Sequence, residues 1–360
     1  MHRQGSQITS AAFWLAFLLA LGMSGRGVGA EDPVAEVRIA GSAWVGDQPT
    51  KVADELGFFN AGRTPGSPVI AVDNHGSGLD AVAVLLRGDA QFALAATTPV
   101  ALALVGALDE AVGASRDIVV LASIALSNQT HTVVSPSNRN IAAPADVAGR
   151  RVGIMFGTSS HYGWSHFSAF HGFAPGDVEL VNVPISRMGD ALLGGVIDAA
   201  VIWPPWDQRL RSELGEDLTE FKLRMIYTVN WLLLAERDFV VRHPEIADRV
   251  MLGYLNAMKF MDRNPARARD IHARQAGLDP DKLARSADGL IWRLSLNWST
   301  LVNMGSQLEW LASWPELAGL ELPAPTDYLF ADPLLRTAPW LVTLPPYLLD
   351  VEVGQPGATR

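Results

Sequence analysis

Residues 146–171 read DVAGRRVGIMFGTSSHYGWSHFSAFH, and this stretch decides the fold. Its apolar segment Arg151–Phe156 predicts a buried strand, and His161–His171 predicts a helix that follows it. Gly157 permits a sharp turn between the two, and the hydroxyl residues 158–160 are of types that cap helix starts. The stretch is therefore typical of the strand–turn–helix unit of an α/β protein.

The turn also predicts an anion site. The first backbone N–H groups of a helix have no acceptor within it, and the helix start carries a partial positive charge. After Gly157, the side chains of Thr158, Ser159 and Ser160 add hydroxyl donors without a fixed countercharge, which suits a sulfonate, a carboxylate or a similar group. The alternative is that Thr158 or Ser159 only caps the helix.

Outward from this stretch, short apolar segments alternate with helical patterns. Strands are expected at Val37–Ala43, Pro68–Asp73, Gln91–Ala95, Ile118–Ala125, Arg151–Phe156, Val178–Val183 and Ala199–Trp203. Helices are expected at Leu79–Arg87, Val100–Leu108, His161–His171, Met188–Leu193, Glu245–Met261, Pro265–Ala276, Asp281–Arg293 and Thr300–Trp314. The alternation predicts βαβ units with mostly parallel sheets, followed by an almost purely helical region from about Pro244.

One segment is echoed later in the chain. Residues 85–95 read LLRGDAQFALA and residues 192–202 read LLGGVIDAAVI. Each has the pattern of a helix end, a glycine and a buried strand, and each leads into a turn that contains proline. Chance similarity between common α/β patterns is one explanation. The other is two similar α/β lobes whose strand ends face a shared cleft, where ligands of open parallel sheets bind.

Composition excludes several classes of protein. The chain has 360 residues and no cysteine, which excludes a disulfide scaffold, thiolate metal sites and a cysteine nucleophile. The formal charge of −10 and the lack of a basic run argue against a nucleic-acid partner. His161, His166 and His171 are spaced by five residues and do not share a helix face, so no metal site and no cofactor are expected.

Both ends of the chain differ from the middle. Residues 1–30 contain Arg3, an apolar stretch and small residues before position 31, the layout of a cleavable secretory signal peptide. An uncleaved N-terminal anchor is the alternative, although the apolar stretch is short for a membrane span. The proline-rich end predicts an extended tail over Ala331–Arg360.

Four segments, in this order, carry a resemblance to a known family: residues 146–153, 157–162, 178–184 and 195–203. The later stretch 235–257 is also similar to a stretch of that family. Together they are similar to the periplasmic substrate-binding proteins of ABC importers for sulfonates, taurine, nitrate and thiamine precursors.

This resemblance implies an α/β, two-lobed periplasmic binding protein fold of type II, with each lobe a mostly parallel sheet flanked by helices. The implied domains are the signal peptide 1–30, a discontinuous lobe I of 31–126 plus 229–330, lobe II of 127–228, and the tail 331–360. The implied function is capture of a small organic anion between the lobes and its delivery to the membrane permease of an ABC importer. The mature protein is expected to be periplasmic, soluble and monomeric.

The resemblance also assigns ligand contacts. In family members the Gly-Thr-Ser loop meets the anionic end of the ligand, which carries over to residues 157–160 with His161 close behind. Four tryptophans near strand ends, which core packing would also explain, suggest apolar walls: Trp44, Trp203, Trp206 and Trp231. Further polar candidates, for which turn chemistry is the alternative, are Gln48, Ser77, Thr97, Thr98 and Asn128. Pro204 stands where members often have an acidic residue, which argues against an amine-bearing ligand such as taurine.

Two other classes of function stay open. An exported hydrolase would use Ser159 and His161, but the G-x-S-x-G motif of a nucleophile elbow is absent. A periplasmic sensor that reports its ligand to a membrane partner would have the same sequence features as a transport protein.

Overall fold

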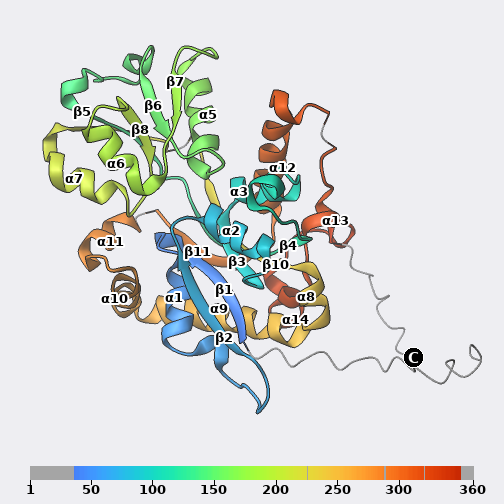
Figure 1. Cartoon of the computed structure of the whole chain (residues 1–360). Coiled ribbons are helices and arrows are strands. Elements are labelled where there is room, and N and C mark those ends of the chain that lie inside the picture. The colour runs from blue at the N-terminus through green and yellow to red at the C-terminus, as the bar shows by residue number, and fades with distance from the viewer. Residues whose placement is uncertain (1–35, 225, 288, 320, 350–360) are drawn as a thin grey trace, which may run out of the picture. The chain divides into compact units, whose positions relative to one another are not determined.

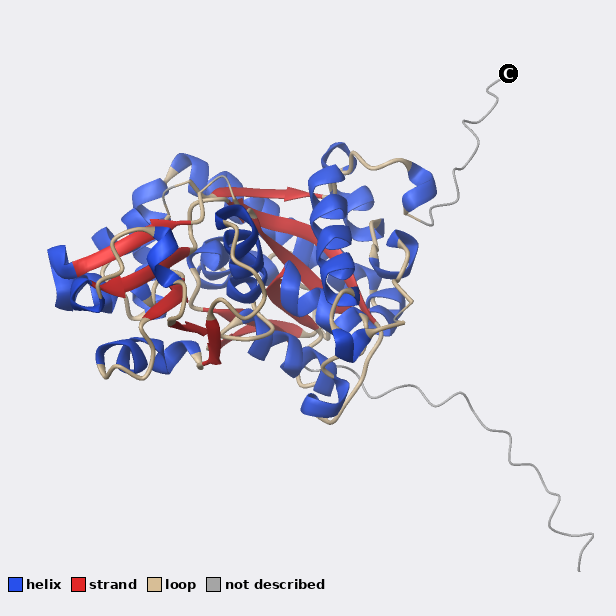
Figure 2. Ribbon diagram, turned by 90° about the horizontal axis from the view of Figure 1, so that it is seen from above, coloured by secondary structure: helices blue, strands red, loops and turns tan. Residues whose placement is uncertain are grey.

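The computed structural model describes residues 36–224, 226–287, 289–319 and 321–349, which fall within one compact unit of the chain. They form two β-sheets with helices packed around them, as Figure 1 and Figure 2 show. The α/β class expected from the sequence is confirmed. The predicted signal peptide, residues 1–30, lies outside the described residues.

The first sheet has six strands in the order β11-β4-β10-β3-β1-β2. Its strands are β1 (Glu36–Ser42), β2 (Val69–His75), β3 (Phe92–Ala96), β4 (Ile118–Ser127), β10 (Val229–Glu236) and β11 (Ile291–Ser295). β1 pairs in parallel with β2 and β3, whereas β10 pairs antiparallel with both β3 and β4. β4 is an almost continuous apolar run that is buried over nearly its whole length, as expected for a central strand.

The second sheet has five strands in the order β7-β6-β8-β5-β9. Its strands are β5 (Thr132–Pro136), β6 (Arg151–Ile154), β7 (Glu179–Asn182), β8 (Ala199–Ile202) and β9 (Leu218–Lys222). β6 pairs in parallel with β7 and β8, and β5 pairs antiparallel with β8 and β9. The chain enters this sheet between Ser127 and Thr132 and leaves it between Lys222 and Val229.

Fourteen α-helices are described. They are α1 (Gln48–Glu55), α2 (Gly78–Arg87), α3 (Thr97–Leu104), α4 (Asp109–Val112), α5 (Ser159–His171), α6 (Ile185–Leu193), α7 (Asp207–Leu214), α8 (Arg237–Arg242), α9 (Pro244–Arg263), α10 (Pro265–Ala276), α11 (Pro280–Ser286), α12 (Trp298–Ala312), α13 (Pro325–Tyr328) and α14 (Asp332–Thr337). α1, α9 and α10 pack on one another beside the first sheet, and α6 packs on β6 and β8 (Figure 1). No helix among the described residues is both long enough and apolar enough to span a bilayer.

The two echoed segments adopt the predicted local structure. α2 ends at Gly88, which has a φ of +81°, and leads into β3. α6 is followed by Gly195, which has a φ of +75°, and leads into β8. Side chains other than glycine rarely adopt this left-handed conformation, so the glycine in each copy serves the same turn.

The structure corrects three details of the sequence analysis. The sheets are mixed and not mostly parallel, because the strands that connect them, β5, β9 and β10, pair antiparallel. The predicted helix Asp281–Arg293 is wrong beyond Ser286, since Ile291–Ser295 form β11. The tail is not extended over Asp332–Thr337, which form α14 and bury Leu334 against α9.

Candidate ligand-binding site

The turn between β6 and α5 has the geometry that the sequence predicts. Gly157 has a φ of +75°, and Thr158 occupies the N-cap with extended backbone. Within the described part of the chain, the backbone N–H groups of Ser159 and Ser160 have no hydrogen-bond acceptor. Two unpaired donors thus open a 13-residue helix, where its partial positive charge is concentrated.

The three hydroxyls of this turn differ in what they bind. Thr158 Oγ1 donates to the carbonyl of Met155 over 2.6 Å and lies 2.9 Å from Ser160 Oγ. Ser160 is fully buried behind the turn. Ser159 Oγ instead lies 2.9 Å from Nε2 of His131. Of the three hydroxyls, that of Ser159 is the one left to interact with a ligand.

A small cavity lies in front of this turn, between the two sheets. Its walls come from the first sheet and its helices (Ser42, Trp44, Gly76, Ser77, Gly78, Leu79, Ala96, Pro99, Val229, Trp231) and from the second (His131, Thr158, Ser159, Trp203, Trp206). Its volume of about 20 Å³ leaves room for about one water molecule. The described structure therefore brings the walls together around a nearly filled space.

The cavity lies between two helix N-termini. α5 begins on one side, and α2 begins on the other with Ser77 as its N-cap. Ser77 Oγ accepts from Asp80 N–H and donates to the Asp80 carboxylate over 2.8 Å, so this hydroxyl already has partners. A methyl group on Gly157 would lie 3.2 Å from Leu102 of α3, which shows how closely the two sides approach.

Two tryptophans of the first sheet form one wall. The ring centroids of Trp44 and Trp231 lie 4.5 Å apart, and both side chains are buried. Gly46 lies directly beneath the Trp44 ring, where a Cβ atom would overlap it. Trp231 donates from Nε1 to Asp47 over 2.5 Å, and Asp47 also accepts from the backbone of Ser42. The fully buried Asp47 thus fixes the orientation of this wall.

The sequence analysis missed His131, which lies just before β5. Its Nδ1 lies 3.1 Å from the Thr130 hydroxyl, and its ring packs near Trp203 and Tyr227 at centroid distances of 5.8 and 5.5 Å. Complete burial lowers the pKa of His131 to about 3, so the ring is neutral at neutral pH. The missing signal was the strand Thr132–Pro136, since recognising it would have placed His131 beside the cavity.

Several predicted site residues lie away from the cavity. Thr97 donates to the Asn230 carbonyl and Thr98 donates to Gln307 over 2.6 Å, so both hold α3 in place. Gln48 is buried in α1 with its carbonyl oxygen unpaired, and Asn128 is half-buried in the segment between β4 and β5. These residues do not line the cavity.

His161 also faces away from the cavity. Its ring stacks on Phe156 at 4.6 Å and contacts Trp310 and Trp314 near the end of α12. Burial lowers the pKa of His161 to about 4. His161 therefore packs between α5 and α12. This contact joins a helix of the second sheet to a helix that packs beside the first sheet.

The geometry weighs against the hydrolase alternative. Ser159 pairs with His131 and not with His161, and the other nitrogen of His131 faces a threonine hydroxyl in place of a carboxylate. A histidine whose pKa is about 3 is a weak general base at neutral pH. Among the described residues, no cluster of histidine and acidic side chains could hold a metal ion.

Two mixed sheets with a cavity between them define an α/β class of protein, and comparison with known proteins gives the family. The chain belongs to the NMT1/THI5-like family, whose model matches residues 49–268. This confirms the resemblance that the sequence motifs carry.

The chain is also similar to a curated protein and to solved structures. The chain is 27% identical over 194 residues to the taurine-binding periplasmic protein of Escherichia coli (strain K12), a match that covers 52% of this chain and 56% of that protein. The alkanesulfonate-binding protein SsuA from Xanthomonas axonopodis pv. citri has a similar structure, with a TM-score of 0.68 at 18% identity over 83% of this chain and 99% of that one. The periplasmic nitrate-binding protein NrtA from Synechocystis PCC 6803 also has a similar structure, with a TM-score of 0.66 at 16% identity. The match covers 88% of this chain and 91% of that one. The periplasmic binding protein fold is thereby confirmed.

Proposed function

We propose that this protein is a periplasmic solute-binding protein that captures a small organic anion between its two sheets. One observation carries the proposal: unpaired N–H groups of Ser159 and Ser160 open α5 beside a cavity whose opposite wall belongs to the other sheet. Such donors stabilise an anion without a formal countercharge. The names of the relatives, which bind taurine, alkanesulfonate and nitrate, support the same class of ligand.

The proposed ligand has an oxyanion head and a small apolar body. The head accepts from the N–H group of Ser159, which lines the cavity, and the body contacts Trp44 and Trp231. If Thr130 donates to Nδ1 of His131, Nε2 carries the proton and donates to Ser159 Oγ. The Ser159 hydroxyl proton is then free to point at the ligand, so the neutral imidazole sets the direction of this donor.

Binding requires the walls to separate and close again. The cavity of about 20 Å³ is too small for a sulfonate, so in this proposal the described structure is more tightly closed than the ligand-bound closed form. The moving parts are the lobes predicted from the sequence, 31–126 plus 229–330 and 127–228. A ligand that contacts both lobes stabilises the closed form by its differential affinity for that form.

The proposal extends to location and partner. We propose that residues 1–30 direct export to the periplasm, that the mature protein is a monomer, and that the closed form delivers its ligand to the permease of an ABC importer. The word "periplasmic" in the names of the taurine- and nitrate-binding proteins supports this location. The absence of an acidic residue at Pro204 favours a ligand without an amine.

A thermal-shift screen tests the proposal. The panel is ethanesulfonate, taurine, a short carboxylate, nitrate and bicarbonate, and a ligand at about 100 times its Kd adds about 2.7 kcal/mol of stability. The Ser159→Ala variant should bind the tightest ligand of the panel more weakly, by roughly 1–3 kcal/mol of binding free energy. Ser168→Ala, on the same helix but away from the cavity, should bind it like the wild type. No shift with any anion, or equal affinity in both variants, would contradict the proposal.

A further inference from the structure

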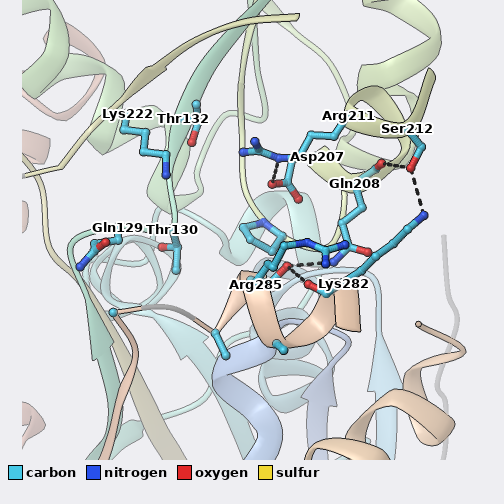
Figure 3. Close-up of a pocket in the computed structure, with 15 residues that line it drawn as sticks. Gln129, Thr130, Thr132, Asp207, Gln208, Arg211, Ser212, Lys222, Lys282 and Arg285 are labelled. Carbon is cyan, nitrogen blue, oxygen red and sulfur yellow. Dashed lines mark hydrogen bonds and ion pairs between the residues drawn. The ribbon is translucent and has the colours of Figure 1, made fainter. Parts of the chain in front are cut away.

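A second, much larger cavity lies beside the connection between the sheets. Its volume is about 810 Å³, within the usual range for small-molecule pockets. One wall comes from α7 and β9 of the second sheet, and the other from α11 and the segment after it (Figure 3). Gln129 and Thr130, between β4 and β5, also line it. Its lining shares no residue with that of the first cavity.

The lining of this second cavity is strongly cationic. Arg211, Lys222, Lys282 and Arg285 face it, and Asp207 is the one acidic side chain among the described residues of the lining. Two of the chain's four lysines are among them, in a protein whose formal charge is −10. A concentration of positive charge in a concave site attracts anions, because the low-dielectric walls focus the field.

Two of the four cations have no partner in the described structure. Arg211 is neutralised by Asp207 at 2.9 Å and by Glu220. Lys282 donates from Nζ to the Ser212 hydroxyl over 3.0 Å. Lys222 and Arg285 form no side-chain hydrogen bond or ion pair with any described residue, and both are exposed to solvent. Among the described residues, Lys222 on one wall and Arg285 on the other are therefore left without a counter-charge.

The remaining lining indicates the chemistry of a ligand. Hydroxyl and amide side chains supply neutral donors, and the apolar members are a proline and small alanines. No aromatic side chain is among the lining residues, so nothing here would stack on a base or bury a large apolar body. A compact hydrophilic anion with more than one negative charge fits such a surface.

The two walls belong to different sheets and already touch. Gln208 of α7 donates to Ser286 of α11 over 2.8 Å, and Lys282 of α11 donates to Ser212 of α7. α11 packs on α10 beside the first sheet, whereas α7 contacts β9 of the second. An anion that bridges Lys222 and Arg285 would therefore link the sheets at a place separate from the first cavity.

We propose that this cavity is a second binding site, for a small multivalent oxyanion of the phosphate or polycarboxylate type, and that its occupant favours the closed form. Anion binding at this site does not depend on the function proposed for the first cavity, whereas the effect on the closed form rests on that function. If both sites bind, however, each ligand raises the affinity for the other by the same factor, since both bridge the same two walls.

Calorimetric titration of the full mature chain with inorganic pyrophosphate and with citrate tests the proposal, in a low-salt buffer free of phosphate. We expect saturable binding of at least one probe that weakens at high salt. The Lys222→Ala/Arg285→Ala variant should lose at least about tenfold in affinity, because it removes two charge-assisted contacts. Lys259→Ala/Arg293→Ala makes the same change in net charge at exposed positions outside the cavity and should bind like the wild type.

The outcomes separate this site from the first. Weaker binding in Lys222→Ala/Arg285→Ala but not in Ser159→Ala supports the second site, whether or not the first site binds an organic anion. Equal loss in the two double variants would mean a general charge effect and would overturn the proposal. Weaker binding in Ser159→Ala alone would place the probe in the first cavity and would overturn the proposal of a second site. The absence of binding by either probe would overturn that proposal as well.

Discussion

Asp47 offers a sharp test of how the tryptophan wall is held. It is fully buried, accepts from Trp231 and Ser42, and lies near Lys51, which is also buried. A Cβ placed on Gly41 would be 3.2 Å from Asp47 Oδ2 and 3.5 Å from Lys51 Nζ, so the two charges share one small region. Burial raises the pKa of Asp47, and the charge of Lys51 opposes this; burial likewise lowers the pKa of Lys51, and Asp47 opposes that.

The Asp47→Asn variant keeps the volume and an acceptor for Trp231 but removes the negative charge. Among the described residues, Lys51 would then keep its buried charge with Asn74 as hydrogen-bond partner and the more distant carboxylate of Asp54, or lose its proton. Removing one partner of a buried charge pair costs about 3–5 kcal/mol. Because the pKa of Lys51 is already lowered, we expect the low end of this range, about 3 kcal/mol.

Urea unfolding followed by tryptophan fluorescence measures the effect. The midpoint should fall in Asp47→Asn at a nearly unchanged slope. The Asp47→Asn/Lys51→Met variant should recover at least half of the loss, because it replaces the pair with a neutral amide and an apolar chain. Asp270→Asn, an exposed residue of α10, is the matched control. The reasoning would be refuted if the free energy of unfolding of Asp47→Asn lay within about 0.5 kcal/mol of the wild-type value. It would also be refuted if the double variant recovered none of the lost stability.

Three further predictions follow from other residues. Because the pKa of His161 is about 4 in the folded protein and near 6.5 when unfolded, the unfolded state takes up the proton first as pH falls. The stability present above pH 6.5 is then lost toward pH 4, and His161→Phe should reduce the loss measured by urea unfolding at pH 7.5 and 4.5 by about 2 kcal/mol; equal losses would contradict this. Gly157→Ala should destabilise by about 1–2 kcal/mol in thermal unfolding, owing to the positive φ and the contact with Leu102, whereas an unchanged midpoint would argue against the turn. Trp310→Ala, which removes the ring beside His161 and Tyr162, should speed hydrogen exchange in the first turns of α5; exchange rates equal to those of the wild type would show that α12 does not hold this helix.

The sequence predicted the local units well where glycine and hydroxyl residues mark an element's end. Gly88 and Gly195 end helices that lead into buried strands, and Gly157 with Thr158 marks the start of α5. These signals act over a few residues, so they can be read without the fold. The tryptophans at strand ends were also informative, since all four line the first cavity.

What the sequence could not predict depends on contacts between distant segments. The direction of β10 is set by insertion between β3 and β4, and no local pattern carries that information. The role of His131 depends on Ser159, 28 residues away, and its neutrality depends on burial. His161 was predicted beside the ligand because it follows Ser160, but the turn of the helix points it at Trp310. The cationic cavity joins Gln129, Thr130 and Thr132 to Lys282 and Arg285, which no motif connects.

The central claim is that backbone N–H groups at the start of α5 bind the ligand's negative charge, and replacing one of them tests it most directly. Ser159 occupies the first position of the helix, where proline is well tolerated, and Thr158 before it is extended, as a residue before proline should be. Ser159→Ala removes the hydroxyl alone, whereas Ser159→Pro removes the hydroxyl and the N–H. Calorimetric titration with the tightest anion of the panel should show Ser159→Pro binding about tenfold more weakly than Ser159→Ala, with similar thermal midpoints for the two free proteins. Equal affinity in the two variants would show that the amide of Ser159 does not bind the anion, and would contradict the account.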